Sequence, residues 1–256
     1  MIRYLFLIGI FLGVSFYGYS QINESDTVRL QTRLAITGAW QTGNVAMFTT
    51  RNKLDLTVAP IEHLVFKTQN AYLYQAFFNK KADEDLSSRN FIYWKPQRTV
   101  YPFVMFFASK SFRRNIDFRY FTGIGATWQI VRSSKTTLKV ALSGVYEQTE
   151  FSKSLFNKNE YDGSEKIATP RATVWLFGKH QIVKDKINFH YECFLQPSVE
   201  KTNNLRWQTE AGLDIFLTKK FSFTANYLYT YESVVTLGQK DFDSILTFGL
   251  SYQIRK

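Results

Sequence analysis

Polar and apolar residues alternate with a period of two along almost the whole chain, and this pattern constrains the fold more than any other feature. The clearest stretch lies near the C-terminus. There one face carries Leu246, Phe248, Leu250, Tyr252 and Ile254, and the other carries Asp243, Thr247, Gly249, Ser251 and Gln253. Such alternation predicts β-strands with one apolar face. A soluble sheet of this length would need a second layer to cover that face.

The alternation predicts twelve strands, and no segment shows a helical period. The expected strands are 29–42, 45–58, 62–77, 85–95, 98–109, 115–132, 135–150, 166–178, 186–199, 204–218, 221–234 and 241–254. Short connections such as Thr218–Lys220 take turns with longer polar ones such as Asn79–Asp85, Ser109–Asn115 and Ser152–Glu165, and Lys179–Asp185 is a longer exception among the short ones. Short turns on one rim and longer loops on the other are typical of an outer-membrane barrel.

Lipid is the covering that fits these strands best. At roughly 14 residues they exceed the strands of a soluble sandwich and are long enough to cross a thin bilayer at a tilt. A closed sheet pairs all its backbone groups, as hydrocarbon requires. We therefore predict an all-β fold, a single transmembrane antiparallel β-barrel over residues 29–256 with short periplasmic turns and longer extracellular loops. An even number of strands places both termini on the periplasmic side.

Aromatic residues are abundant, at 17% of the chain. Near strand ends they fit the two interfacial girdles of a membrane barrel. The expected girdle residues are Trp40, Tyr74, Phe77, Tyr93, Tyr101, Trp128, Tyr146, Trp175, Tyr229, Tyr231 and Tyr252.

The first twenty residues differ from the rest. Arg3 precedes an apolar run, and the small residues Gly18 and Ser20 stand where a signal peptidase cleaves. This pattern predicts a secretory signal peptide over residues 1–20, followed by a short lead-in at 21–28. The alternative, an uncleaved anchor helix, fits less well because the apolar run is short. Export of this kind predicts a location in a bacterial outer membrane.

The chain is basic, with a formal net charge of +11, and has a single cysteine, Cys193. One cysteine excludes an internal disulfide. An exported chain has little access to nucleic acid, so the charge favours other anions. The partners we expect are outer-membrane lipid and lipopolysaccharide, the barrel-assembly machinery and small solutes.

Several segments together resemble a known family. They are "GAWQTGNVAMFTTRNKLDL", "SSRNFIYWK", "FRRNIDFRYFTGIGATWQIVRSSKTTLKVALSGVYEQTEF", "LRWQTEAGLDIFLTKKFSFTANYLYTYES" and "KDFDSILTFGLSYQI". In this order they resemble the DUF481 family, the YdiY-like salt-induced outer-membrane proteins. The resemblance covers nearly all of the chain after residue 20. It implies an outer-membrane barrel of uncharacterised function and carries over no catalytic residues.

Charged residues in the middle of strands are the main candidates for function, because a closed sheet would turn them into the lumen. The candidates are Arg33, Lys53, Asp55, Lys67, Asp117, Arg119, Lys139, Glu147, Arg171, Glu192, Arg206, Glu210 and Asp214, with Arg29, Arg51 and Glu232 on the same predicted face. Both signs occur. They fit a narrow channel with charge-set selectivity, or a plugged interior held by ion pairs.

Catalytic and metal sites find little support. Of the three histidines only His190 lies well inside a strand, beside Asn188 and Glu192, and a hydrogen-bonding role suits it better than a metal. Neither Ser198 nor Ser222 is a compelling nucleophile for it. The glycines of "FTGIGATW" lack the helix and third glycine of a phosphate loop. We expect no enzyme, metal or cofactor, with a membrane hydrolase as the exception to be tested.

The sequence therefore leaves two main functions open. The first is a structural role or narrow-channel passage of small solutes. The second is an occluded barrel whose extracellular loops, chiefly Ser152–Glu165, bind a ligand or partner.

Overall fold

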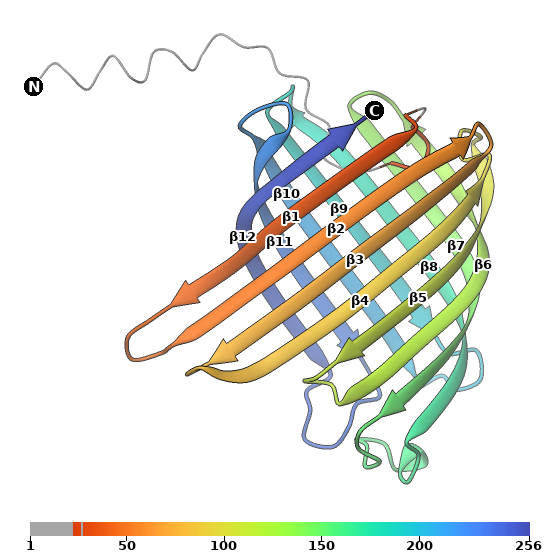
Figure 1. Ribbon diagram of the computed structural model, residues 1–256. Helices are drawn as coiled ribbons and strands as arrows, with labels where there is room; N and C mark the ends of the chain where they lie inside the picture. Colours follow the sequence, from red (N-terminus) through yellow and green to blue (C-terminus); the bar gives the residue numbers. More distant parts are fainter. Residues whose placement is uncertain (1–22, 27) are drawn as a thin grey trace, which may run out of the picture.

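The protein folds as one closed β-barrel of twelve antiparallel strands (Figure 1). A computed structural model describes residues 23–26 and 28–256, so the predicted signal peptide lies outside the described residues. The strands are β1 (Leu30–Gln41), β2 (Met47–Ile61), β3 (Leu64–Phe77), β4 (Lys80–Trp94), β5 (Val100–Ser111), β6 (Ile116–Arg132), β7 (Thr136–Phe151), β8 (Lys166–Val183), β9 (Ile187–Pro197), β10 (Leu205–Phe216), β11 (Phe221–Glu232) and β12 (Phe242–Arg255). The predicted fold class is confirmed.

Each strand pairs with its neighbours in the chain, and β1 pairs with β12 to close the sheet. A short 3₁₀ turn, η2 (Asn159–Tyr161), interrupts the connection between β7 and β8. Within the described residues no helix is long and apolar enough to span a membrane.

The two rims of the barrel differ. The terminal rim, which carries the start of β1 and the end of β12, has the connections 62–63, 95–99, 133–135, 184–186 and 217–220. The loop rim has the connections 42–46, 78–79, 112–115, 152–165, 198–204 and 233–241. The longest connections therefore gather on the rim opposite the termini.

Two predicted strand ends were wrong by five residues. β4 begins at Lys80 rather than 85, because Phe78 and Asn79 make a tight turn with φ of 47° and 61°. Asparagine tolerates this left-handed conformation, so two residues are enough to reverse the chain. β8 continues to Val183 rather than 178, with Lys179 opposite His190 in the ladder. The expected long connection at 179–185 is therefore a short turn at 184–186.

The longest loop folds back over part of the loop rim. Phe156 and Tyr161 from this loop pack with Ile116, Phe151 and Val234 in a buried apolar cluster. Asn204 donates a hydrogen bond of 3.1 Å to the Tyr161 hydroxyl. The loop thus covers the rim above β6, β7 and β11 and leaves the opposite side uncovered by this cluster.

Candidate functional site

Most of the charged residues predicted to face the lumen do so. Buried inside the barrel are Arg33, Asp55, Lys67, Arg119, Lys139, Glu147, Arg171, Glu192, Arg206, Glu210 and Asp214, and Lys53 is half-buried beside Glu210. Arg51 is also buried and Glu232 lies at the same depth as Arg119, which it contacts. These side chains form the interior surface because the strand period places alternate residues on it.

Two of the predicted lumen residues lie elsewhere. Asp117 is exposed, because a bulge between Ile116 and Phe118 inserts one extra residue and shifts the faces. Ile116 is consequently buried on the inside rather than facing out. A one-residue shift reverses the face of every residue before it in the strand. Arg29 precedes β1 and is also exposed.

Ion pairs cross the lumen from wall to wall. Arg51 on β2 donates two hydrogen bonds of 3.0 Å to Glu210 on β10, and Lys53 reaches the same carboxylate at 2.6 Å. Arg89 on β4 pairs with Glu192 on β9, on the far wall. Because these strands are not neighbours in the sheet, the pairs bridge the interior rather than reinforce one ladder.

Glu147 on β7 is the centre of a cationic cluster. Its carboxylate lies 2.6 Å from Arg206, 3.3 Å from Arg171 and 3.7 Å from Arg119. Arg119 also donates two hydrogen bonds of 2.8 Å to Glu232 on β11. The cluster therefore ties β6, β7, β8, β10 and β11 together across one end of the lumen.

An apolar core fills the middle of the lumen, a feature that the sequence did not reveal. Its buried members are Val65, Phe91, Tyr93, Tyr101, Phe103, Met105, Phe121, Ala141, Val145, Trp175 and Phe194. Phe91 on β4 meets Trp175 on β8 edge to face, with ring centroids 6.2 Å apart. Arg206 from β10 lies over the Phe121 ring of β6 at 5.2 Å.

Three residues predicted for the aromatic girdle belong to this core instead. Tyr93, Tyr101 and Trp175 are 4%, 0% and 1% exposed and point inward. Trp40, Trp128 and Tyr146 are exposed on the outside, as a girdle requires. The inward rings pack against one another and against the opposite wall, so they fill part of the lumen.

The chain before β1 enters the lumen at the terminal rim. Glu24 is 6% exposed and accepts hydrogen bonds from the Tyr101 hydroxyl at 2.7 Å and from Lys139 at 2.8 Å, while Lys67 lies 3.4 Å away. Burial opposes ionisation of Glu24, but Lys139 and Lys67 outweigh it and hold its pKa well below the ordinary value. We call Asn23–Asp26 the lead-in plug.

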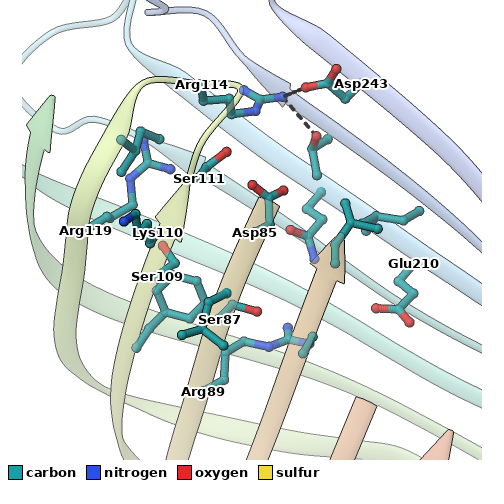
Figure 2. A pocket seen from close by; sticks show the side chains of 18 of the residues that line it. Asp85, Ser87, Arg89, Ser109, Lys110, Ser111, Arg114, Arg119, Glu210 and Asp243 are labelled. Carbon is teal, nitrogen blue, oxygen red and sulfur yellow. Dashed lines mark hydrogen bonds and ion pairs between the residues drawn. The ribbon is translucent and has the colours of Figure 1, made fainter. Parts of the chain in front are cut away.

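A cavity remains between the apolar core and the loop rim. It has an empty volume of about 1240 Å³, which includes solvent at its mouth. Figure 2 shows Asp85, Arg89, Lys110, Arg114 and Glu210 around it, from opposite walls of the barrel. We call this space the cationic vestibule. Eight basic and four acidic side chains line it.

Two neighbouring cations of this lining were not predicted from the sequence. Arg113 and Arg114 lie in the connection before β6, where the prediction placed an ordinary polar loop. Arg113 lies 2.7 Å from Asp83 and 3.2 Å from Asp243, and its side chain is 38% exposed. Arg114 donates a hydrogen bond of 2.8 Å to Asp243 on β12 (Figure 2). Adjacent arginines at a strand end are the only signal that the sequence offers for this site.

The remaining candidate residues make contacts that fit a structural role. His190 Nδ1 lies 3.3 Å from Asp214, which Arg33 also contacts at 2.8 Å. A Cβ on Gly212 would meet the His190 ring at 2.3 Å, so this glycine leaves room for the imidazole. Cys193 faces outward, and its sulfur accepts a hydrogen bond from Thr209. In the described part of the chain, no cluster of three His, Cys, Asp or Glu side chains suits a metal ion.

Comparison with solved structures places the fold among outer-membrane β-barrels. The chain is similar to the NanC porin with a TM-score of 0.52 and 11% identity, over 86% of this chain and 100% of the porin. It is also similar to the translocator domain of the autotransporter NalP from Neisseria meningitidis (TM-score 0.46, 11% identity, 89% of each chain). The outer membrane channel DcaP of Acinetobacter baumannii matches at a TM-score of 0.39 and 11% identity, over 89% of this chain and 95% of that one. At these identities the likeness concerns the fold alone.

Comparison of the sequence gives the family. No curated protein matches the chain. The family described as "Protein of unknown function, DUF481" matches residues 38–254, from the middle of β1 to the end of β12. The chain therefore belongs to the DUF481 family.

Proposed function

We propose that this protein is an exported outer-membrane barrel, occluded at rest, whose cationic vestibule binds an anionic solute from outside the cell. The observation that carries the proposal is the basic lining of the vestibule, with eight basic side chains and four acidic ones. Among the basic ones, Arg89, Arg113 and Arg206 also pair with acidic side chains outside the lining. Partly enclosed cations attract anions more strongly than exposed ones, because solvent screens them less. Arginine also matches the geometry of carboxylate and phosphate groups.

The contents of the lumen support occlusion rather than free passage. A solute leaving the vestibule toward the terminal rim meets the Arg89–Glu192 pair, then the ring of Trp175, and then the lead-in plug at Glu24. Each of these is held by contacts to more than one strand. We propose narrow-channel passage as the alternative, in which this column of side chains rearranges.

The outer surface supports a location in lipid. Large apolar side chains are exposed around the barrel, among them Ile124 at 69%, Leu142 at 60% and Leu250 at 54%. Exposed apolar surface of this extent marks a membrane-facing region. In this setting the loop rim faces outward, and outer-membrane lipid and lipopolysaccharide surround the strands.

Calorimetric binding of citrate and inorganic phosphate to the purified protein tests the proposal. Lys110 and Arg113 are the suitable positions, because both line the vestibule and both are accessible. The double variant Lys110→Gln/Arg113→Gln is expected to bind about 10-fold more weakly, a change of about 1.4 kcal/mol. Lys219→Gln/Lys220→Gln removes the same charge from the terminal rim and is the matched control.

The wild-type affinity is also expected to fall as salt rises, because the attraction is electrostatic. Absence of anion binding in wild type, or equal affinities for the vestibule and control variants, would contradict the proposal.

A further inference from the structure

The seam between β1 and β12 is paired along only part of its length. The ladder runs from Gln31 opposite Arg255 to Gly38 opposite Phe248 and ends there. Yet β1 continues to Gln41, and β12 begins at Phe242. In Figure 1 the two strands diverge toward the loop rim.

The flanking ladders continue past this point. Ala39, Trp40 and Gln41 all pair with β2. On the other side of the seam, residues 245–247 all pair with β11. Three expected pairs between β1 and β12 are therefore absent in a barrel whose neighbouring ladders are complete at the same height. We call this opening the seam split.

Two glycines lie at the end of the paired part of the seam. A Cβ on Gly249 would lie 2.0 Å from the Ile36 carbonyl oxygen, and one on Gly38 would lie 2.4 Å from the Thr49 carbonyl oxygen. At Gly249 the close approach is to β1 across the seam, and at Gly38 it is to β2. Glycines in strands permit such close approach and sharp bending. The Thr37 hydroxyl donates to the Thr247 hydroxyl at 2.9 Å at the end of the paired part.

The cationic vestibule lies on the inner side of the seam and reaches from its paired part to the split. Its lining includes Asp243 and Ile245 from β12 and Arg51 and Lys53 from β2. These strands flank β1, and β1 itself contributes no residue to the lining among the described residues. Ile245 is the lining residue that lies nearest the split, since it would pair with Gln41 in a continued ladder.

The outer side of the split is apolar. Trp40 is 80% exposed, and Leu246, Phe248 and Ile36 are 51%, 47% and 56% exposed. On a barrel in lipid, Trp40 lies in the interfacial girdle and the apolar side chains below it meet acyl chains. Unpaired backbone groups of the split cannot remain without partners in hydrocarbon. The split therefore lies at the level of the girdle residue Trp40, where acyl chains meet headgroups.

We propose that the seam split is a lateral portal for a phosphate-bearing lipid, whose headgroup enters the vestibule while its acyl chains stay in the leaflet. This inference rests on the proposed function, since it uses the same cavity. The inward-facing Ile245 and Leu228 beside the split suit the glycerol and first methylenes of such a lipid, and Arg51 and Arg114 suit its phosphate. An anion without acyl chains does not need a route from the leaflet.

Closing the split with a disulfide tests the portal. Continuing the ladder by one step places Ala39 opposite Thr247, so Ala39→Cys/Thr247→Cys closes it when oxidised, in a Cys193→Ser background. Leu34→Cys/Tyr252→Cys locks the part of the seam that is already paired and is the control. Native mass spectrometry after extraction from nanodiscs then measures retention of phosphatidate, with phosphatidylcholine as the zwitterionic comparison. Calorimetry measures glycerol 3-phosphate, which is the same headgroup without chains.

Oxidation of the Ala39→Cys/Thr247→Cys variant is expected to lower phosphatidate retention at least 10-fold and to leave glycerol 3-phosphate binding within twofold. Equal retention in the oxidised and reduced forms overturns the portal, as does equal retention of phosphatidylcholine. If the protein binds glycerol 3-phosphate but not phosphatidate, the portal is overturned and the proposed function stands. Binding of neither overturns the proposed function as well.

A distance measurement covers the case in which that disulfide does not form. Spin labels at Trp40→Cys/Leu246→Cys straddle the split, and labels at Ile36→Cys/Leu250→Cys straddle the paired seam. Paired strands hold opposite Cα atoms about 5 Å apart. A longer and broader distance for the first pair supports the split, and equal distances overturn it.

Discussion

Arg119 on β6 reaches across the lumen to Glu232 on β11 with two parallel hydrogen bonds of 2.8 Å. Four strands separate β6 from β11 along one side of the barrel wall. The pair therefore spans the interior, and paired guanidinium and carboxylate planes of this kind are among the strongest polar contacts in proteins.

Removing one partner of this pair is expected to destabilise the barrel. Glu232→Gln leaves Arg119 and Arg114 with less compensation inside the lumen, and we expect a loss of about 3 kcal/mol. Urea unfolding in lipid vesicles measures it. The double variant Arg119→Met/Glu232→Leu removes both charges and is expected to cost less than the single change. A larger loss for the double variant would contradict this account.

Glu147 is expected to be the most sensitive carboxylate. Glu147→Gln leaves Arg119, Arg171 and Arg206 crowded without their shared anion, so we expect a loss of about 3–5 kcal/mol in the free energy of unfolding. The control is Glu150→Gln on the same strand, whose carboxylate is 36% exposed and pairs with the exposed Lys166. It is expected to change stability by about 0–1 kcal/mol. Similar losses for the two variants would refute the assignment of Glu147 as the centre of the cluster.

The lead-in plug is expected to resist mild acid. The pKa of Glu24 is lowered in the folded state, so its stabilisation is present above its ordinary value of 4.5 and is lost only as the pH falls through the lower value. Mobility of a spin label at Val28→Cys, in a Cys193→Ser background, should stay constant from about pH 8 to about pH 5. In the Glu24→Gln variant the same label should be mobile from about pH 8 to about pH 5. A transition in wild type near neutral pH would contradict the ion-pair account.

Trp175 is expected to be a structural part of the occlusion. Trp175→Ala removes a 1% exposed ring that packs on Phe91, Phe177 and Phe194, and should cost about 3–5 kcal/mol. It should also produce measurable ion current, because it opens the apolar core. Trp175→Phe keeps most of the ring and removes an indole N–H that has no hydrogen-bond partner, so it should cost much less and stay closed. Current through both variants alike would show that this ring does not close the lumen.

The strands that the sequence predicted best are those with one face in each environment. On β12, Leu246, Phe248 and Leu250 face outward, and Thr247 and Ser251 are buried inside. On such strands the period of two is enough to assign each residue to a face, because lipid and a polar lumen select opposite residue types. On β6 the same reasoning failed only before the bulge, at Ile116 and Asp117, since a local insertion leaves no mark in the alternation.

The apolar core was not predictable from alternation alone. On β5, Tyr101, Phe103 and Met105 are buried while their neighbours Val104 and Phe106 are exposed, so both faces are apolar and the period disappears. The continuous apolar run "YPFVMFF" was the available signal, because a strand that packs on both faces loses its polar side. Nothing in the sequence indicated that Glu24 is buried, because its partners Lys67 and Lys139 come together only when the barrel closes.

Conductance of the purified wild-type protein in a planar bilayer tests the central claim most directly. The interior ion pairs, the apolar core and the lead-in plug together predict a barrel that conducts no ions, with no resolvable current steps at moderate voltage. Steady, ohmic current steps from the wild-type protein would show an open pore and contradict the account.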